Sequence, residues 1–248
     1  MTRLVAGVDA VFFDIDGTLL DHDAASAASL RLRLAVELGG DEELDDERFA
    51  LALDEWRRLE LLHYDEYLRG AIDLSEQRRR RTAGILRWIG AELRSERALD
   101  AWFESFLDGY RDGWAAFEDV EGTIPALEAH GSLELGVITN ADASIQRRKL
   151  AAMGVGERLP AFVASSLVGR AKPDPAIFTA ACDLVGLEPG RVAYVGDRLD
   201  VDALGARDAG LVGVWLDRKG EAAAAETTDG VHVISGLGEL TGFLGLDD

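Results

Sequence analysis

The chain has 248 residues, 48% of them hydrophobic, which is typical of a folded protein with one large domain or a core with an insertion. Its formal net charge of −20 argues against a nucleic-acid backbone or an anionic membrane surface as a partner. Because Cys182 is the single cysteine of the chain, an internal disulfide framework is excluded. The sequence has neither a membrane-length apolar run nor a signal-peptide pattern, so we expect a soluble, cytoplasmic protein.

The first predicted element is a buried strand that ends in two carboxylates. Residues 8–13 form a short run rich in Val and Phe, and Asp14, Asp16 and Gly17 follow it closely. Ligands of open α/β sheets bind at the carboxyl ends of the strands, where this pattern places Asp14. A divalent cation with oxygen ligands would offset the repulsion between the two carboxylates. A turn without function is the alternative, since Asp and Gly are common turn residues.

The next part of the chain predicts helices and no strand. Leu30 and Leu34 would share one face of a helix, Ser75 would cap another, and the basic run 78–81 would form a solvated or salt-bridged face. A block of about ninety residues is too long for a loop. We therefore predict two domains, a helical cap and a catalytic core, at residues 21–116 and at residues 1–20 with 117–248.

After this block, strand-like runs alternate with helical patterns. The strand-like runs lie at 135–138, 161–164, 191–195, 211–216 and 231–234. The helical patterns lie at 123–130, 143–153, 175–185 and 203–209. Such alternation is typical of parallel βαβ units. The predicted fold class is therefore α/β, a doubly wound, mainly parallel, Rossmann-like sheet with an inserted α-helical cap domain.

Polar side chains also end the later strand-like runs. Thr139 and Asn140 follow one of them, and a hydroxyl and an amide can donate hydrogen bonds to an anion. Lys172 precedes Pro173 and Pro175, which stiffen the backbone and would hold the lysine in place. Taken singly, these residues could equally be a helix cap and a solvated surface lysine.

A further cluster of acids follows the run at 191–195. Asp197 comes directly after this run and belongs at the same sheet edge as the first carboxylates. Asp202 should begin the next helix, where it would either cap the helix or support a bound metal. Asp200 is a second, weaker candidate for that supporting role.

In this order and spacing, the four segments resemble the motifs of the haloacid-dehalogenase-like hydrolase superfamily. The resemblance covers essentially the whole core, and the inserted helices look like the helical cap of that superfamily. The stretches 139–146 and 172–178 are similar to its small-molecule phosphatases. The nearest likeness is to the 5′-nucleotidase and N-acylneuraminate-9-phosphatase members.

The resemblance implies a phosphatase that works through an aspartyl-phosphate intermediate. Asp14 would be the nucleophile, and Asp16 would act as the general acid toward the leaving alcohol and then as the base toward water. Lys172 would neutralise the nucleophile and the phosphate together. Thr139 and Asn140 would bind the phosphate oxygens, where charge accumulates in the transition state.

The resemblance also implies a Mg²⁺ ion at the same place. Its ligands would be the Asp14 carboxylate, the Asp16 backbone carbonyl and the Asp197 carboxylate, completed by waters. Asp202, or less favourably Asp200, would orient those waters without binding the metal itself. The expected partner is a small phosphorylated substrate, and the protein would be a monomer or a homodimer.

Other functions are compatible with this fold. A 2-haloacid dehalogenase needs neither a metal nor an acid for its halide leaving group, so Asp16 and Asp197 favour a phosphatase over it. A phosphomutase shares the core and would be recognised by its products. A non-catalytic binding or regulatory protein on the same scaffold would require a broken active site, whereas all expected groups are present.

Overall fold

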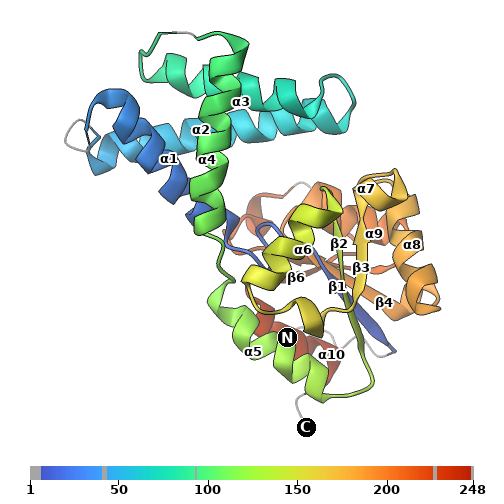
Figure 1. Cartoon of the computed structure of the whole chain (residues 1–248). Helices are drawn as coiled ribbons and strands as arrows, with labels where there is room; N and C mark the ends of the chain where they lie inside the picture. Colours follow the sequence, from blue (N-terminus) through green and yellow to red (C-terminus); the bar gives the residue numbers. More distant parts are fainter. Residues whose placement is uncertain (1–6, 41–43, 93, 226–227, 247–248) are drawn as a thin grey trace. The chain divides into compact units, whose positions relative to one another are not determined.

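The computed structural model describes residues 7–40, 44–92, 94–225 and 228–246. The chain divides into two compact units, Met1–Asp21 with Ala115–Asp248 and, separately, His22–Trp114. We call them the sheet unit and the helical unit (Figure 1). Within the described ranges, none of the helices combines the length and the apolar character that crossing a bilayer requires.

The sheet unit contains a six-stranded parallel sheet with the order β3-β2-β1-β4-β5-β6. Its strands are β1 (Ala10–Phe13), β2 (Glu134–Thr139), β3 (Ala161–Ala164), β4 (Val192–Gly196), β5 (Val212–Leu216) and β6 (His232–Ile234). The chain reverses its direction of winding at β1, which lies between β2 and β4. Doubly wound sheets bind their ligands at such a switch point. The predicted α/β fold is therefore confirmed.

Helices cover both faces of this sheet. They are α5 (Glu118–Ala129), α6 (Ala143–Ala152), α7 (Ser165–Val168), α8 (Pro175–Val185), α9 (Leu204–Asp208) and α10 (Leu240–Leu244), with 3-10 turns at Gly156–Arg158, Pro189–Arg191, Ala222–Ala224 and Leu237–Glu239. Phe178 of α8 packs in one cluster with Phe12 and Tyr194. Val11 and Phe13 alternate to the opposite face and are equally buried. In Figure 1, α5 and α10 lie together on the side of the sheet away from α8.

Two site segments differ in detail from the prediction. Lys172 does not end a strand, because α7 and a turn separate it from β3. Asp202 does not begin α9, because it lies inside a π-helical turn, Leu199–Ala203, that leads into that helix. The wider turn adds a residue before the regular helix starts.

The chain leaves and re-enters the sheet unit at neighbouring positions. Leu20 forms an antiparallel bridge with Ala116, and the Asp21 N–H donates to the Ala115 carbonyl at 3.0 Å. The Phe117 N–H donates to a carbonyl of the departing segment, also at 3.0 Å. The outgoing and returning segments therefore pair like the two arms of a hairpin.

The helical unit is built from α1 (His22–Leu38), α2 (Asp46–Leu68), α3 (Leu74–Trp88) and α4 (Glu96–Asp112). Its core is aromatic. Trp56 is fully buried, and its ring centroid lies 6.0 Å from that of Trp102, 6.2 Å from Phe103 and 4.8 Å from Phe106. Aromatic pairs at these separations contribute stability beyond their buried area.

Charges organise the surface of the helical unit. Asp73, and not Ser75, is the N-cap of α3, since its carboxylate accepts a hydrogen bond at 2.8 Å from the backbone N–H three residues on. A carboxylate in this position also interacts favourably with the helix dipole. Arg78, Arg79 and Arg80 of the basic run form salt bridges as expected, and Arg79 donates to Asp100 at 2.7 Å and 2.8 Å. Arg81 differs from the expectation, because it is buried and its guanidinium lies 4.2 Å from the ring centroid of Trp56.

Candidate active site

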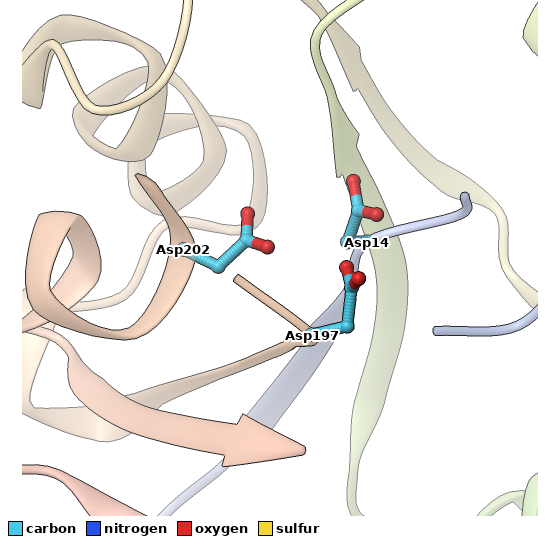
Figure 2. Close-up of side chains that lie close together, drawn as sticks. All are labelled: Asp14, Asp197 and Asp202. Carbon is cyan, nitrogen blue, oxygen red and sulfur yellow. The ribbon is translucent and has the colours of Figure 1, made fainter. Parts of the chain in front are cut away.

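Two carboxylates leave neighbouring strands at the switch point of the sheet. Asp14 directly follows β1, and its N–H donates to the Val195 carbonyl of β4 at 2.8 Å. Asp197 directly follows β4. Carboxylate oxygens of Asp14, Asp197 and Asp202 lie within 4.8 Å of one another. Figure 2 shows the three side chains close together. The fold thus brings together three of the residues that the sequence predicted for this edge.

Two glycines make room for this cluster. Gly17 has a φ of 88°, and a Cβ added there would lie 2.4 Å from an oxygen of Asp197. A Cβ added at Gly196 would lie 2.4 Å from the Cβ of Asp202. Both contacts are far shorter than packed atoms allow, so only glycine permits the backbone to approach these carboxylates so closely.

A buried lysine neutralises part of the cluster. The Lys172 ammonium lies 2.6 Å from Asp14 Oδ1, 2.8 Å from Asp202 Oδ1 and 2.6 Å from the Tyr194 hydroxyl, and the residue is 3% exposed. The Asn140 side chain accepts from the Lys172 N–H at 2.6 Å and donates to the Lys172 carbonyl at 2.8 Å. These two bonds fix the loop that carries the lysine. Sequence reasoning missed Tyr194, which looks like an ordinary strand residue.

Burial and mutual repulsion shape the ionisation of this cluster. Burial raises the pKa of Asp14 to about 7, a rise that Lys172 opposes and Asp202 reinforces. Burial, with Asp202 and Asp14, raises the pKa of Asp197 to about 8. Burial lowers the pKa of Lys172, but the adjacent carboxylates outweigh it and the net shift is upward. Too little positive charge therefore surrounds these carboxylates to compensate them, and their oxygens are suitable ligands for a hard divalent cation.

Asp202 lies in the cluster, whereas Asp200 is exposed. One oxygen of Asp202 accepts from Lys172 at 2.8 Å, and the other accepts from the Arg198 N–H at 3.1 Å. Asp200 is paired with the Arg198 guanidinium at 2.9 Å. Because protein donors already contact both of its oxygens, Asp202 is suited to supporting a metal site rather than to providing its main ligand.

The Asp16 carboxylate is held by two side chains of α6 that the sequence analysis did not single out. The Lys149 ammonium lies 2.5 Å and 2.8 Å from its two oxygens. The Gln146 amide nitrogen donates to Asp16 Oδ2 at 3.0 Å and to the Thr139 hydroxyl oxygen at 2.6 Å. A signal was present, because Lys149 is one of only three lysines in the chain and lies one helical turn from Gln146.

These features define a class of protein. A Rossmann-like sheet with a carboxylate cluster and a buried lysine at its switch point is an α/β enzyme fold with its site in the usual place. The family model for haloacid dehalogenase-like hydrolases matches residues 8–210. The chain belongs to this family, as the motifs predicted, and it is a hydrolase.

Relatives with named activities include phosphatases. The glyceraldehyde 3-phosphate phosphatase of Methanopyrus kandleri is 30% identical, over 85% of this chain and 84% of its own. The N-acylneuraminate-9-phosphatase of Rattus norvegicus is 28% identical, over 96% and 94% respectively, which confirms the predicted likeness to that group. The fold is shared with the Bacillus subtilis HAD-hydrolase YfnB, solved bound to magnesium, at a TM-score of 0.77, 20% identity and coverage of 96% and 99%.

Proposed function

We propose that this hydrolase is a Mg²⁺-dependent phosphatase that cleaves a small phosphorylated carbohydrate through an aspartyl-phosphate. The observation that carries the proposal is the contact between Lys172 and Asp14 at 2.6 Å inside a cluster of carboxylates. A carboxylate can attack an anionic phosphate only where positive charge offsets the repulsion. The names of the two phosphatase relatives, which act on phosphate esters of carbohydrate-like molecules, support the substrate class.

The metal would be bound by the Asp14 carboxylate, the Asp16 backbone carbonyl and the Asp197 carboxylate. When bound, Mg²⁺ supplies charge neutralisation for the phosphate oxygens and for the acids around them. The raised pKa values of Asp14 and Asp197 support this placement, because a cation would stabilise both carboxylates in their charged form. Asp202 would support the site through its contacts with Lys172 and the Arg198 N–H.

In the first half-reaction an Asp14 oxygen attacks phosphorus, and the bond between phosphorus and the leaving oxygen breaks. The Asp16 carboxyl gives its proton to that oxygen, so the alcohol leaves neutral. Lys172 offsets charge at the nucleophile. The Thr139 hydroxyl accepts from Gln146 and can still donate its own hydrogen to a phosphate oxygen.

In the second half-reaction water attacks the phosphorus of the aspartyl-phosphate. The Asp16 carboxylate removes a proton from this water, the new phosphorus–oxygen bond forms, and the bond from phosphorus to Asp14 breaks. Inorganic phosphate leaves, and the Asp14 carboxylate is restored. Asn140, whose side chain holds the Lys172 backbone, would help the phosphate site mainly by fixing this loop.

A dehalogenase would also use a carboxylate nucleophile. Its halide leaves without a proton and without a metal, so neither the carboxylate of Asp16 nor that of Asp197 would have a role. The chain instead provides Asp16 with two nearly buried partners. Two residues that hold a proton-transferring group favour a phosphatase over a dehalogenase.

The test is phosphate release from a panel of sugar phosphates, glyceraldehyde 3-phosphate, nucleoside monophosphates and p-nitrophenyl phosphate, with Mg²⁺ and with EDTA. We expect Mg²⁺-dependent hydrolysis of at least one phosphomonoester and loss of about 10³-fold or more in Asp14→Asn. Asp183→Asn, which changes an exposed carboxylate of α8, is the matched control and should remain active. No Mg²⁺-dependent release from any ester would refute the proposal, and an isomerised sugar phosphate would indicate a phosphomutase.

A further inference from the structure

We infer that Lys149 and Gln146 are positioning residues that hold the Asp16 carboxylate in the orientation from which it exchanges protons with the leaving group and with water. This inference rests on the proposed phosphatase function and adds two residues to its machinery. Both residues come from α6, which starts close to the end of β2 and therefore begins at the edge of the sheet that carries the site.

The contacts fix the carboxylate at two points. Lys149 contacts both oxygens, at 2.5 Å and 2.8 Å, and Gln146 donates to Oδ2 at 3.0 Å. A carboxylate with one partner can still rotate about that contact, whereas partners on both oxygens set the plane of the group. Proton transfer requires such placement within hydrogen-bond reach of the reacting oxygen.

Gln146 and Lys149 are more deeply buried than the Asp16 carboxylate that they hold. Gln146 is 1% exposed and Lys149 is 6% exposed, whereas the Asp16 side chain keeps 31% of its surface exposed. Gln146 and Lys149 are thus packed into the protein, while the Asp16 carboxylate remains accessible to a substrate. Lysine is rarely buried unless it is paired, because its charge and its flexible chain both oppose burial.

The use of lysine in this chain points the same way. Of the three lysines, Lys219 is exposed, while Lys172 and Lys149 are buried against Asp14 and Asp16 respectively. Each carboxylate of the turn after β1 therefore has its own buried ammonium. In the proposed mechanism one ammonium serves the nucleophile and the other serves the proton-transferring acid.

Gln146 additionally links the acid to the phosphate site. The same amide nitrogen donates to Asp16 Oδ2 and, at 2.6 Å, to the Thr139 hydroxyl oxygen. Its amide oxygen is buried and has no hydrogen-bond partner among the residues that the structure describes. A buried amide oxygen without a partner is destabilising, so the orientation of Gln146 favours the site over the stability of the fold.

The inference predicts an effect that depends on the leaving group. Nitrophenolate leaves without protonation, whereas the alkoxide of a sugar phosphate needs a proton from a well-placed acid. In single-turnover experiments, Lys149→Met should slow cleavage of an alkyl phosphate about 10–100-fold and cleavage of p-nitrophenyl phosphate by less than about threefold. In steady-state assays the KM of Lys149→Met should stay within about threefold of the natural value for both substrates. Lys149→Arg should recover part of the lost rate with the alkyl phosphate.

Controls separate positioning from folding. Gln146→Leu should show the same selectivity with a smaller loss, and it remains informative if Lys149→Met does not fold. Arg147→Met removes a charge from the same helix, where the guanidinium stacks over Phe162, and should keep the activity of the natural chain. Equal losses on both substrates, or no loss on either, would overturn the inference.

A crystal structure of Lys149→Met gives a readout that does not depend on turnover. We expect the Asp16 side chain to occupy a new rotamer or several rotamers. An unmoved Asp16 would overturn the inference even if the natural chain is an active phosphatase. If the natural chain hydrolyses no phosphate ester, the proposed function fails, and the position of Asp16 in the variant still decides whether Lys149 holds it.

Discussion

At the scale of single residues, the site is defined by charges that the protein balances only in part. Asp14 and Asp16 each contact a buried ammonium, but Asp197 lies partly buried beside Asp14 and Asp202, and desolvation together with these neighbours raises its pKa to about 8. Buried carboxylates without enough counter-charge bind protons or cations. The site thus has an affinity for positive charge that depends on pH.

This affinity predicts how metal-free stability responds to pH. A carboxyl with a pKa of 3.8 when unfolded and about 8 when folded binds its proton more tightly in the folded state. The unfolded chain ionises at lower pH than the folded one, so stability should fall as the pH rises from about 4 to about 8 and should level off above that. Mg²⁺ binds the ionised form, so the increase in Tm that it causes should grow over the same range.

Thermal melts between pH 6 and 9, in EDTA and in Mg²⁺, would measure this response. Other groups titrate in the protein as well, so the decisive quantity is the difference in Tm between the natural chain and Asp197→Asn at each pH. The variant cannot ionise at this position and should lose less stability as the pH rises in EDTA. A natural chain that gains stability relative to the variant over this range would contradict the assignment.

At the scale of the elements, the turn after β1 sets the geometry of the site. Gly17→Ala would place a Cβ 2.4 Å from Asp197 and would force a side chain into a left-handed conformation with a φ of 88°. The backbone strain alone should lower the free energy of unfolding by about 1–2 kcal/mol. The clash should also displace Asp197 and weaken Mg²⁺ binding and activity by about tenfold or more.

Gly154→Ala is the matched control for this change. Gly154 has a φ of 71°, but an added Cβ there meets no atom within 4 Å. Both variants should therefore lose similar stability in urea unfolding, and only Gly17→Ala should lose activity and metal affinity. Equal activity in the two variants would show that the close approach to Asp197 is not needed.

The boundaries of the strands could be predicted from the sequence, whereas the side-chain contacts of α6 could not. Each strand begins and ends within two residues of its predicted run, because short apolar runs between polar breaks report burial directly. The sequence did not suggest Gln146 and Lys149, because their contacts with Asp16 join residues 130 and 133 positions apart. Such contacts depend on where α6 is directed after β2, which local patterns do not encode.

Other differences have similar causes. The π-helical turn Leu199–Ala203 was not predicted, because the sequence pattern indicates a helix only from about residue 203. Tyr194 alternates correctly for a buried strand, and only the structure shows that its hydroxyl contacts Lys172 at 2.6 Å. Periodicity predicts which residues are buried, but it does not identify their partners.

At the scale of the whole molecule, the net charge of −20 is a constant source of self-repulsion. Salt screens exposed charges over about 10 Å at 0.1 M and over about 3 Å at 1 M. The Tm should therefore rise by about 2–6 °C between low salt and about 1 M NaCl at neutral pH. Near pH 5, close to the isoelectric point of about 4.5, the rise should be smaller. A Tm that falls with added salt at neutral pH would show that salt bridges outweigh the repulsion.

The hairpin-like pairing of Leu20 with Ala116 has a consequence for how such a protein can change. Because the polypeptide departs and returns at hydrogen-bonded neighbours, the sheet needs from the intervening stretch only that its two ends meet. A different module whose termini lie equally near one another could be spliced in at this junction, and every strand would keep its partners. The chemistry at the sheet edge and the segment added at the junction are thus free to diverge at separate rates.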